Sequence, residues 1–401
     1  MKSSVHDSSA FIANPLGKSG GAIYIHIPFC KQACHYCDFH FSTSLKKKDE
    51  MILALAKEMQ LRKTEFESIA VETIYFGGGT PSILSVEDLK LLLDEVFKNF
   101  NVVQNPEITI EANPDDLFTN LSLHSNRFEE LRELGVTRLS IGIQSFFEDD
   151  LKIMNRAHNA EEAKKCLEFA TQYFDNISID LIYGIPNMTN QKWLQNIQTA
   201  LSYGVPHISS YALTVEPKTA LKQLIKAGTI PEPKDEVAQE HFEILVKTLN
   251  QHGFIQYELS NFGKPNYFSK NNSGYWLGKK YLGIGPSAHS FDGIKRSWNI
   301  ANNSLYIKGI KENKLPSESE ILTKNDRYNE YIMTGLRTVW GVSLGRIEND
   351  FGTTYTDYLL QQAQKFLADD LLIIENAVLL TTAKGKFLSD GIASDLFIIN
   401  D

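Results

Sequence analysis

Three cysteines, Cys30, Cys34 and Cys37, follow one another in a C-x3-C-x2-C spacing within eight residues. Thiolates are soft ligands that favour zinc, copper(I) and iron–sulfur clusters. Three thiols on one short loop can point toward the same place and bind one small metal centre together. The spacing therefore predicts a metal centre, and an iron–sulfur cluster is the first interpretation.

Two other interpretations of the triplet stay open. A structural zinc takes four Cys or His ligands, and His26, His35 and His40 lie near enough in the sequence to supply the fourth. A disulfide with one spare thiol is the third interpretation, which a reducing cytoplasm disfavours. The aromatic neighbours Phe29 and Tyr36 suit a sheltered cluster or a zinc knuckle equally.

Six apolar runs typical of β-strands, most followed by a segment of helical periodicity, must position the triplet. They cover residues 22–27, 72–76, 107–111, 138–143, 176–182 and 207–213. Consecutive βα units predict a parallel sheet, because each crossover between parallel strands needs a helix. The loops after such strands meet at one edge of the sheet, so we expect a single site there, with the cysteine loop directly after the first strand.

The cysteine loop, residues 24–39, resembles the cluster loop of radical S-adenosylmethionine (SAM) proteins. The resemblance continues in family order through blocks at 76–81, 111–114, 141–146, 155–158, 180–186 and 281–289. It is similar to the branch that contains the oxygen-independent coproporphyrinogen III oxidases and the HemW-type heme chaperones. The implied fold is α/β, an incomplete (β/α)6 barrel with a C-terminal, mainly α-helical domain that resembles a winged helix.

The resemblance implies a [4Fe–4S] cluster on Cys30, Cys34 and Cys37 whose fourth iron has no protein ligand. The amino and carboxylate groups of SAM would chelate that iron. An electron passed through the cluster would then cleave the sulfonium bond, giving methionine and a 5′-deoxyadenosyl radical. The implied partners are an electron donor such as flavodoxin or ferredoxin, a heme or porphyrin ligand, and a heme-acceptor protein.

Residues after the second and third strands make up part of the implied SAM site. Gly78, Gly79 and Thr80 would let the backbone approach the methionyl group closely and offer it hydrogen bonds. Glu111 would accept from the amino group or a ribose hydroxyl, and Arg156 would pair with the carboxylate.

Four further residues complete that implied site. Gln144 and Asp180, at strand ends, suit the ribose hydroxyls of SAM. Tyr24 and Tyr36 would flank its methionyl and adenine parts. Each of these residues alone is typical of an ordinary loop, but their joint placement after successive strands favours binding.

Two departures from the oxidase pattern favour the heme-chaperone branch. The oxidases carry a further cysteine two residues after the last cluster ligand, where this chain has Phe39. They also carry a longer segment ahead of the cluster strand. No catalytic residue is assigned, and decarboxylation of coproporphyrinogen III is not expected.

A third departure concerns heme itself. HemW-like proteins have a His-Asn-x-x-Tyr-Trp motif credited with heme binding, and this chain has Asn271 in place of the histidine. An amide is a poor ligand for heme iron compared with an imidazole. Asn272, Tyr275 and Trp276 match the motif, so we expect this segment to belong to the heme region.

Other histidines are therefore alternative heme ligands, His289 first and His26 second, although a lone histidine beside glycines is more often structural. Three hypotheses remain: a heme-trafficking chaperone, a radical-SAM enzyme acting on a porphyrinogen or another substrate, and a zinc-holding or degenerate structural protein. The blocks of the SAM site count against the third hypothesis.

Net charge and the lack of long apolar runs exclude some classes of binding partner. The 401 residues carry a net charge of −9, which provides no electrostatic footprint for nucleic acid or an anionic membrane. No apolar run is long enough to span a membrane or serve as a signal peptide. We expect a cytoplasmic protein without stable membrane insertion, in which the fourth cysteine, Cys166, is a small buried hydrophobic residue.

We expect four segments: an N-terminal tail at 1–21, the barrel core at 22–220, a barrel extension on the substrate or heme side at 221–314, and the winged-helix-like domain at 315–401. The order of elements in the last segment is typical of DNA-binding domains. However, its seven basic and thirteen acidic side chains leave a net charge of −6, which serves phosphate contacts poorly. The expected role of this domain is a lid or cover.

Overall fold

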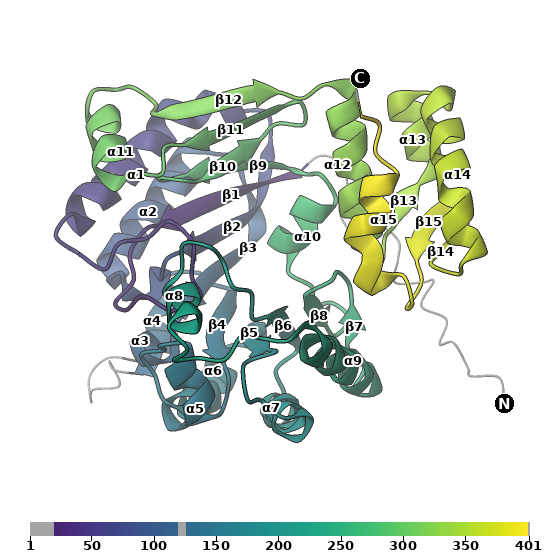
Figure 1. The fold of residues 1–401 in the computed structure, drawn as a ribbon. Coiled ribbons are helices and arrows are strands. Elements are labelled where there is room, and N and C mark those ends of the chain that lie inside the picture. Colours follow the sequence, from purple (N-terminus) through teal and green to yellow (C-terminus); the bar gives the residue numbers. More distant parts are fainter. Residues whose placement is uncertain (1–19, 119–125, 400–401) are drawn as a thin grey trace.

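The computed structural model describes residues 20–118 and 126–399 (Figure 1). Six parallel strands lie side by side in chain order, and each is predicted by one of the apolar runs. They are β1 (Gly20–Ile27), β2 (Ala70–Gly78), β3 (Val102–Ala112), β4 (Arg138–Gln144), β5 (Ile177–Tyr183) and β6 (His207–Ala212). Residues 1–19 of the expected N-terminal tail lie outside the described residues.

Further strands extend the sheet at both sides, giving twelve strands in one sheet. β9 (Lys280–Ile284) pairs in parallel with β1, and β10 (His289–Phe291), β11 (Lys295–Asn299) and β12 (Ser317–Ile321) continue antiparallel. β8 (Asn261–Gly263) pairs antiparallel with β6, and β7 (Ile255–Gln256) follows. Within the described part of the chain β1 pairs with β9 and not with β6, so the arc of six strands stays open, as an incomplete barrel requires.

Helices connect and cover these strands (Figure 1). They are α1 (Lys48–Arg62), α2 (Val86–Asn99), α3 (Pro114–Phe118), α4 (Arg127–Glu133), α5 (Glu148–Ile153), α6 (Ala160–Tyr173), α7 (Asn190–Ser202), α8 (Ala220–Lys226), α9 (Asp235–Gln251), α10 (Lys270–Trp276) and α11 (Asn303–Lys311). Side-chain caps fix the N-terminal ends of several helices. Ser85 and Asp88 form a reciprocal capping box on α2, as Asn159 and Glu162 do on α6.

The core between strands and helices is apolar, and Cys166 is fully buried in it.

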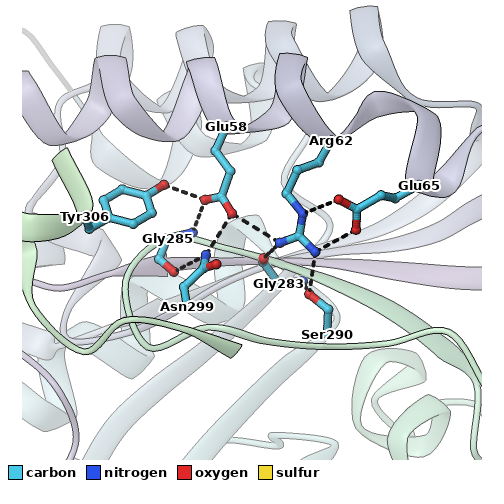
Figure 2. A network of polar contacts seen from close by, with 8 residues as sticks. All are labelled: Glu58, Arg62, Glu65, Gly283, Gly285, Ser290, Asn299 and Tyr306. Atoms are coloured by element: carbon cyan, nitrogen blue, oxygen red, sulfur yellow. Dashed lines mark hydrogen bonds and ion pairs between the residues drawn. The ribbon is translucent and has the colours of Figure 1, made fainter. Parts of the chain in front are cut away.

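A buried ionic network attaches α1 to the β9–β11 extension (Figure 2). Glu58 accepts hydrogen bonds from Tyr306 Oη at 2.5 Å, from Asn299 Nδ2 at 2.7 Å and from Gly285 N at 2.8 Å. Arg62 pairs with Glu58 at 3.1 Å and donates to Gly283 O at 2.8 Å. Residues 281–289, one of the blocks that carry the family resemblance, therefore serve to fix the sheet extension.

The C-terminal unit has its own apolar core, between Tyr328 and Leu396. It consists of α12 (Lys324–Leu336), β13 (Val342–Ser343), α13 (Leu344–Phe351), α14 (Thr353–Ala368), β14 (Leu372–Glu375), β15 (Val378–Thr381) and α15 (Ser389–Asp395). Three helices followed by a hairpin is the predicted winged-helix-like order. However, β12 lies within the segment 315–401 yet pairs with β11, so by its hydrogen bonds it belongs to the large sheet.

Within residues 20–118 and 126–399, no helix is both long enough and apolar enough to cross a membrane.

Candidate functional site

The loop after β1 brings the three cysteines to the wall of one cavity of about 150 Å³, where the parallel strands end. Nearly all of the residues predicted for the cluster and for SAM line this cavity. They are Cys30, Cys34, Tyr36, Cys37, Gly78, Gly79, Thr80, Glu111, Gln144, Arg156 and Asp180. Side chains that are up to 150 residues apart in sequence thus meet at one place, because parallel strands end at the same edge.

Backbone hydrogen bonds hold the cysteine loop against its neighbours. Thr80 N donates to Phe29 O at 2.7 Å, and Gly79 N donates to Ile27 O at 2.9 Å. A Cβ atom on Gly79 would lie 2.5 Å from Phe29 O, so only glycine fits this contact. The triple glycine therefore serves to seat the cysteine loop.

This seating uses the backbone N–H groups of Gly78, Gly79 and Thr80. The sequence predicts that this segment offers hydrogen bonds to the methionyl group, and each of its three N–H groups has a partner in the chain. Gly78 N donates to Glu111 Oε2 at 3.1 Å, and the other two bond the cysteine loop. The hydrogen bonds that this segment can offer to a ligand therefore come from carbonyl oxygens, which suit an amino group.

The histidines considered as a fourth zinc ligand are engaged elsewhere. His26 shares hydrogen bonds with Tyr24 Oη at 3.2 Å and His40 O at 2.9 Å, so both of its ring nitrogens have partners. His35 Nδ1 bonds Ile153 O, and His40 Nε2 bonds the Asn303 side chain. In the described segments no three His, Cys, Asp or Glu side chains converge closely enough to hold a single metal ion. Three thiols around one cavity suit a wider object, in which each thiolate binds a different iron.

Arg156 lies beside the thiols with part of its guanidinium unused. It donates to Cys34 Sγ at 3.2 Å, to Asn113 Oδ1 at 2.6 Å and to Gly142 O at 3.0 Å. Its Nε is buried and has no hydrogen-bond partner among the described residues. An unpartnered buried donor is costly, and a carboxylate in the cavity would satisfy it. The donor set therefore fits the carboxylate of SAM next to a thiolate-bound cluster.

Two carboxyl groups line the same cavity in different surroundings. Glu111 accepts from Tyr75 Oη at 2.7 Å and from the N–H of Gly78, and burial raises its pKa. Burial first, and then the charge of Glu111, raise the pKa of Asp180 to about 7. Two acceptors thus face the region where an amino group and ribose hydroxyls would lie.

A second cavity, of about 250 Å³, adjoins the first inside the barrel and shares Glu111, Ser140 and Asp180 with it. Tyr24 lines this second cavity and not the first, with its ring 6.0 Å from that of Tyr75. That Tyr24 flanks the methionyl or adenine part of SAM stays a prediction.

Sequence reasoning missed several polar residues of the two cavities. Asn113, which orients Arg156, lies in one of the quoted blocks, so a signal for it was present. Ser178, His207 and Tyr257 form a buried chain of hydrogen bonds of 2.6 and 2.8 Å in the barrel. They lie at the starts of strands or in loops, where the local pattern indicates only packing.

The residues expected in the heme region separate into different environments. Asn271 is 4% exposed and accepts from Thr73 Oγ1 at 2.9 Å, while Asn272 and Tyr275 also line the barrel cavity. Trp276 faces α12, with the Arg337 guanidinium 5.8 Å from its ring centre. His289 is exposed on β10 beside Trp298.

These positions do not all line one cavity: Asn271, Asn272 and Tyr275 line the barrel cavity, and Trp276 lines another. Asn271 is occupied by a structural hydrogen bond, and His289 lines neither the barrel cavity nor the cavity around the cysteines. His26 has partners at both ring nitrogens, and burial lowers its pKa to about 4, so it is neutral but not free.

An open arc of six parallel strands with a cysteine triplet after the first one defines a radical SAM protein. The radical SAM superfamily model matches residues 24–200, and the HemN C-terminal domain model matches residues 322–388. The coproporphyrinogen III oxidase HemN of Escherichia coli, a radical SAM enzyme, has a similar solved structure, with a TM-score of 0.81 and 24% identity over 97% of this chain and 92% of that one. This likeness confirms the predicted fold.

Comparison with relatives identifies the family within the class of radical SAM proteins. The heme chaperone HemW of Bacillus subtilis is 38% identical over 92% of this chain and 96% of its own length. HemW of Mycobacterium tuberculosis is 32% identical over 93% and 94%. The chain belongs to the HemW family of radical SAM proteins, as the motifs predicted. Membership of the radical SAM superfamily implies a [4Fe–4S] cluster and SAM.

Proposed function

We propose that this protein is a heme chaperone, which binds heme and transfers it to an acceptor protein. The observation that carries the proposal is the 38% identity across 96% of the Bacillus subtilis heme chaperone. Phe39 supports it, because this side chain, at the position of the additional oxidase cysteine, is 69% exposed and can bind no iron.

In this proposal Cys30, Cys34 and Cys37 hold the cluster, and SAM lies against it in the same cavity. The cluster and SAM together supply one-electron cleavage chemistry when bound. Arg156 orients the SAM carboxylate through its free Nε, and the carbonyl oxygens after β2 accept from the amino group.

Other residues of the cavity would fix the nucleoside of SAM. Glu111 and Asp180 accept from hydroxyl or amino groups, and Gln144 adds an amide at the end of β4. Tyr36 closes the side of the cavity next to Cys37. We also propose that the C-terminal unit is a lid or substrate-side cover. The proposed reductant is an electron carrier such as a flavodoxin or ferredoxin, in the cytoplasm.

A radical-SAM enzyme acting on a porphyrinogen is the second candidate. The polar barrel cavity of about 250 Å³ next to the cluster cavity favours it, since a substrate there would lie beside SAM. The missing additional cysteine at Phe39 counts against oxidase activity.

The test begins with anaerobic reconstitution with iron and sulfide, followed by titration with hemin and by mixing with an apo-hemoprotein such as apomyoglobin. We expect a brown, redox-active protein that takes up one heme and passes it on. A protein that takes up no heme would overturn the chaperone proposal. A protein that decarboxylates coproporphyrinogen III over many turnovers would favour the second candidate.

A further inference from the structure

Residues of α10, of the sheet extension and of the C-terminal unit line a cleft. Its volume is about 820 Å³, more than three times the 250 Å³ of the barrel cavity. Aromatic and apolar side chains from both units form its walls: Tyr275, Tyr281, Phe291, Tyr331, Met333 and Phe351. This volume is within the usual range for a cofactor site.

The cleft continues into a second hollow of about 490 Å³, which Trp276 and Trp340 line. Tyr331, Arg346 and Asp350 line both hollows, so they mark the junction. A large flat ligand at this junction would contact aromatic side chains in either direction.

Helix α10 separates the cleft from the barrel. Asn271 faces inward and bonds Thr73 of β2, whereas Tyr275 lines both the barrel cavity and the cleft. Trp276 lines the adjoining hollow. Of the matched heme motif, Tyr275 therefore lines the cleft and Trp276 the adjoining hollow, whereas the substituted first residue lines neither.

Arginines provide the cleft with anion-binding groups. Arg327 makes no ion pair with a described residue, and its buried Nε has no hydrogen-bond partner there. Arg296, by contrast, pairs with Glu330 and Glu320, and Arg346 pairs with Asp350 at 3.2 Å. Arg327 is thus the cation of the cleft that is left for a ligand carboxylate.

Tyr331 is the residue of the cleft best equipped to bind a metal ion. The Arg346 guanidinium lies 4.1 Å from the centre of its ring, and Ser343 N donates to its hydroxyl at 2.9 Å. The N–H donor fixes the position of the phenol oxygen, which keeps a lone pair for a metal ion. Burial raises the pKa of Tyr281, which disfavours the same role there. Tyrosinate is an established class of axial ligand for heme iron.

We infer that ferric heme binds in this cleft, with the Tyr331 phenol oxygen on the iron and Arg327 at a propionate. The inference rests on the proposed chaperone function and adds the site and the ligand. On coordination the phenol releases its proton to solvent and no electron is transferred.

The test is a titration of the reconstituted protein with hemin and, separately, with iron-free protoporphyrin IX. Absorption and resonance Raman spectra of the hemin complex report on phenolate ligation. We expect Tyr331→Phe to lower hemin affinity about tenfold or more and to remove the phenolate bands, while protoporphyrin affinity stays unchanged. Tyr281→Phe, the same change in the same cleft, should retain the bands.

Arg327→Gln should weaken both ligands about tenfold, because both carry the propionates. Arg132→Gln, an exposed arginine on α4, is its control and should change neither affinity.

The outcomes separate the two proposals. If wild-type protein takes up no hemin, the chaperone function and this site both fall. If it takes up hemin and neither Tyr331→Phe nor Arg327→Gln alters hemin affinity or the spectrum, heme does not bind in this cleft. The chaperone function then stands. Loss of the phenolate bands in Tyr281→Phe instead of Tyr331→Phe would overturn the assigned ligand.

Discussion

The hydroxyl of Thr73 donates to Asn271 Oδ1 over 2.9 Å, which ties α10 to β2 at the position where HemW-like proteins carry a histidine. The N–H group of Asn271 also donates to the Glu107 carboxylate, at 3.1 Å. The side-chain oxygen and the backbone N–H group of Asn271 thus both fix α10, the helix that separates the barrel from the cleft.

Asn271→His should therefore not create heme affinity. The imidazole would be directed at β2, away from the cleft, and the substitution should cost about 1 kcal/mol of stability through the disturbed buried hydrogen bond. Hemin titration and urea unfolding check the two effects. A gain of tenfold or more in heme affinity would place heme on the barrel side of α10.

Each of Cys30→Ala, Cys34→Ala and Cys37→Ala should abolish the iron–sulfur cluster. The three thiols surround one cavity, and each is expected to bind a different iron of the cluster. Iron and sulfide analysis after anaerobic reconstitution provides the readout. Cys166→Ala, the control, should load fully, since that thiol is buried in the core.

Gly79→Ala should impair the seating of the cysteine loop. Its Cβ would lie 2.5 Å from Phe29 O and 2.8 Å from Ile27 O, and backbone atoms can yield only by moving the loop. We expect a loss of about 1–3 kcal/mol in the free energy of unfolding and poor cluster retention. Gly391→Ala, on α15 with open space around it, should be harmless or slightly stabilising. Equal behaviour of the two variants would contradict the seating role.

Asp180→Asn should stabilise the protein at alkaline pH. Burial and Glu111 raise the pKa of Asp180 to about 7, so the stability it contributes is complete at low pH and is lost as pH rises through 7. Asn cannot ionise, so the variant should exceed wild type by about 1–2 kcal/mol at pH 8 and match it near pH 4. Urea unfolding across this range, with the exposed Asp175→Asn as control, tests the sign. A constant difference at all pH values would mean that Asp180 is not the titrating group.

Glu58→Gln should destabilise the junction of α1 and the sheet extension (Figure 2). The substitution leaves the buried Arg62 without its charge partner on α1, and breaking such a buried pair costs about 3–5 kcal/mol. Partial relief comes from Glu65, which also contacts Arg62 at 2.8 Å. Thermal unfolding measures the loss. Glu50→Gln, which removes an exposed pair with Lys311, should have no measurable effect.

The fold was predictable where the information is local. The six strands alternate or run apolar over short distances. All limits lie within two residues of the expected ones except the start of β3, which lies five residues earlier. The pairing of Gly21 with Lys280 was not predictable. It joins residues that lie far apart in the sequence, through backbone groups that carry no sequence signal.

The candidate site divides in the same way. The convergence of Cys30, Glu111 and Gln144 follows from strand ends meeting at one edge, so the sequence indicated it. The use of the Gly79 N–H by Ile27 depends on how one loop packs against another, which spacing does not specify. Asn271 faces inward because the Glu107 carboxylate, which accepts from its N–H group, fixes the placement of α10. The heme-binding motif contains no residue that indicates this contact.

The position of β1 between β2 and β9 has a consequence for synthesis of the protein. β9 begins at Lys280, so more than two-thirds of the 401 residues must leave the ribosome before β1 gains its second neighbour. Until then the strand that carries the cysteine loop is an open edge, able to pair with other chains. Iron delivered to a nascent chain would meet a half-built sheet, whereas iron delivered after release would meet the finished cavity.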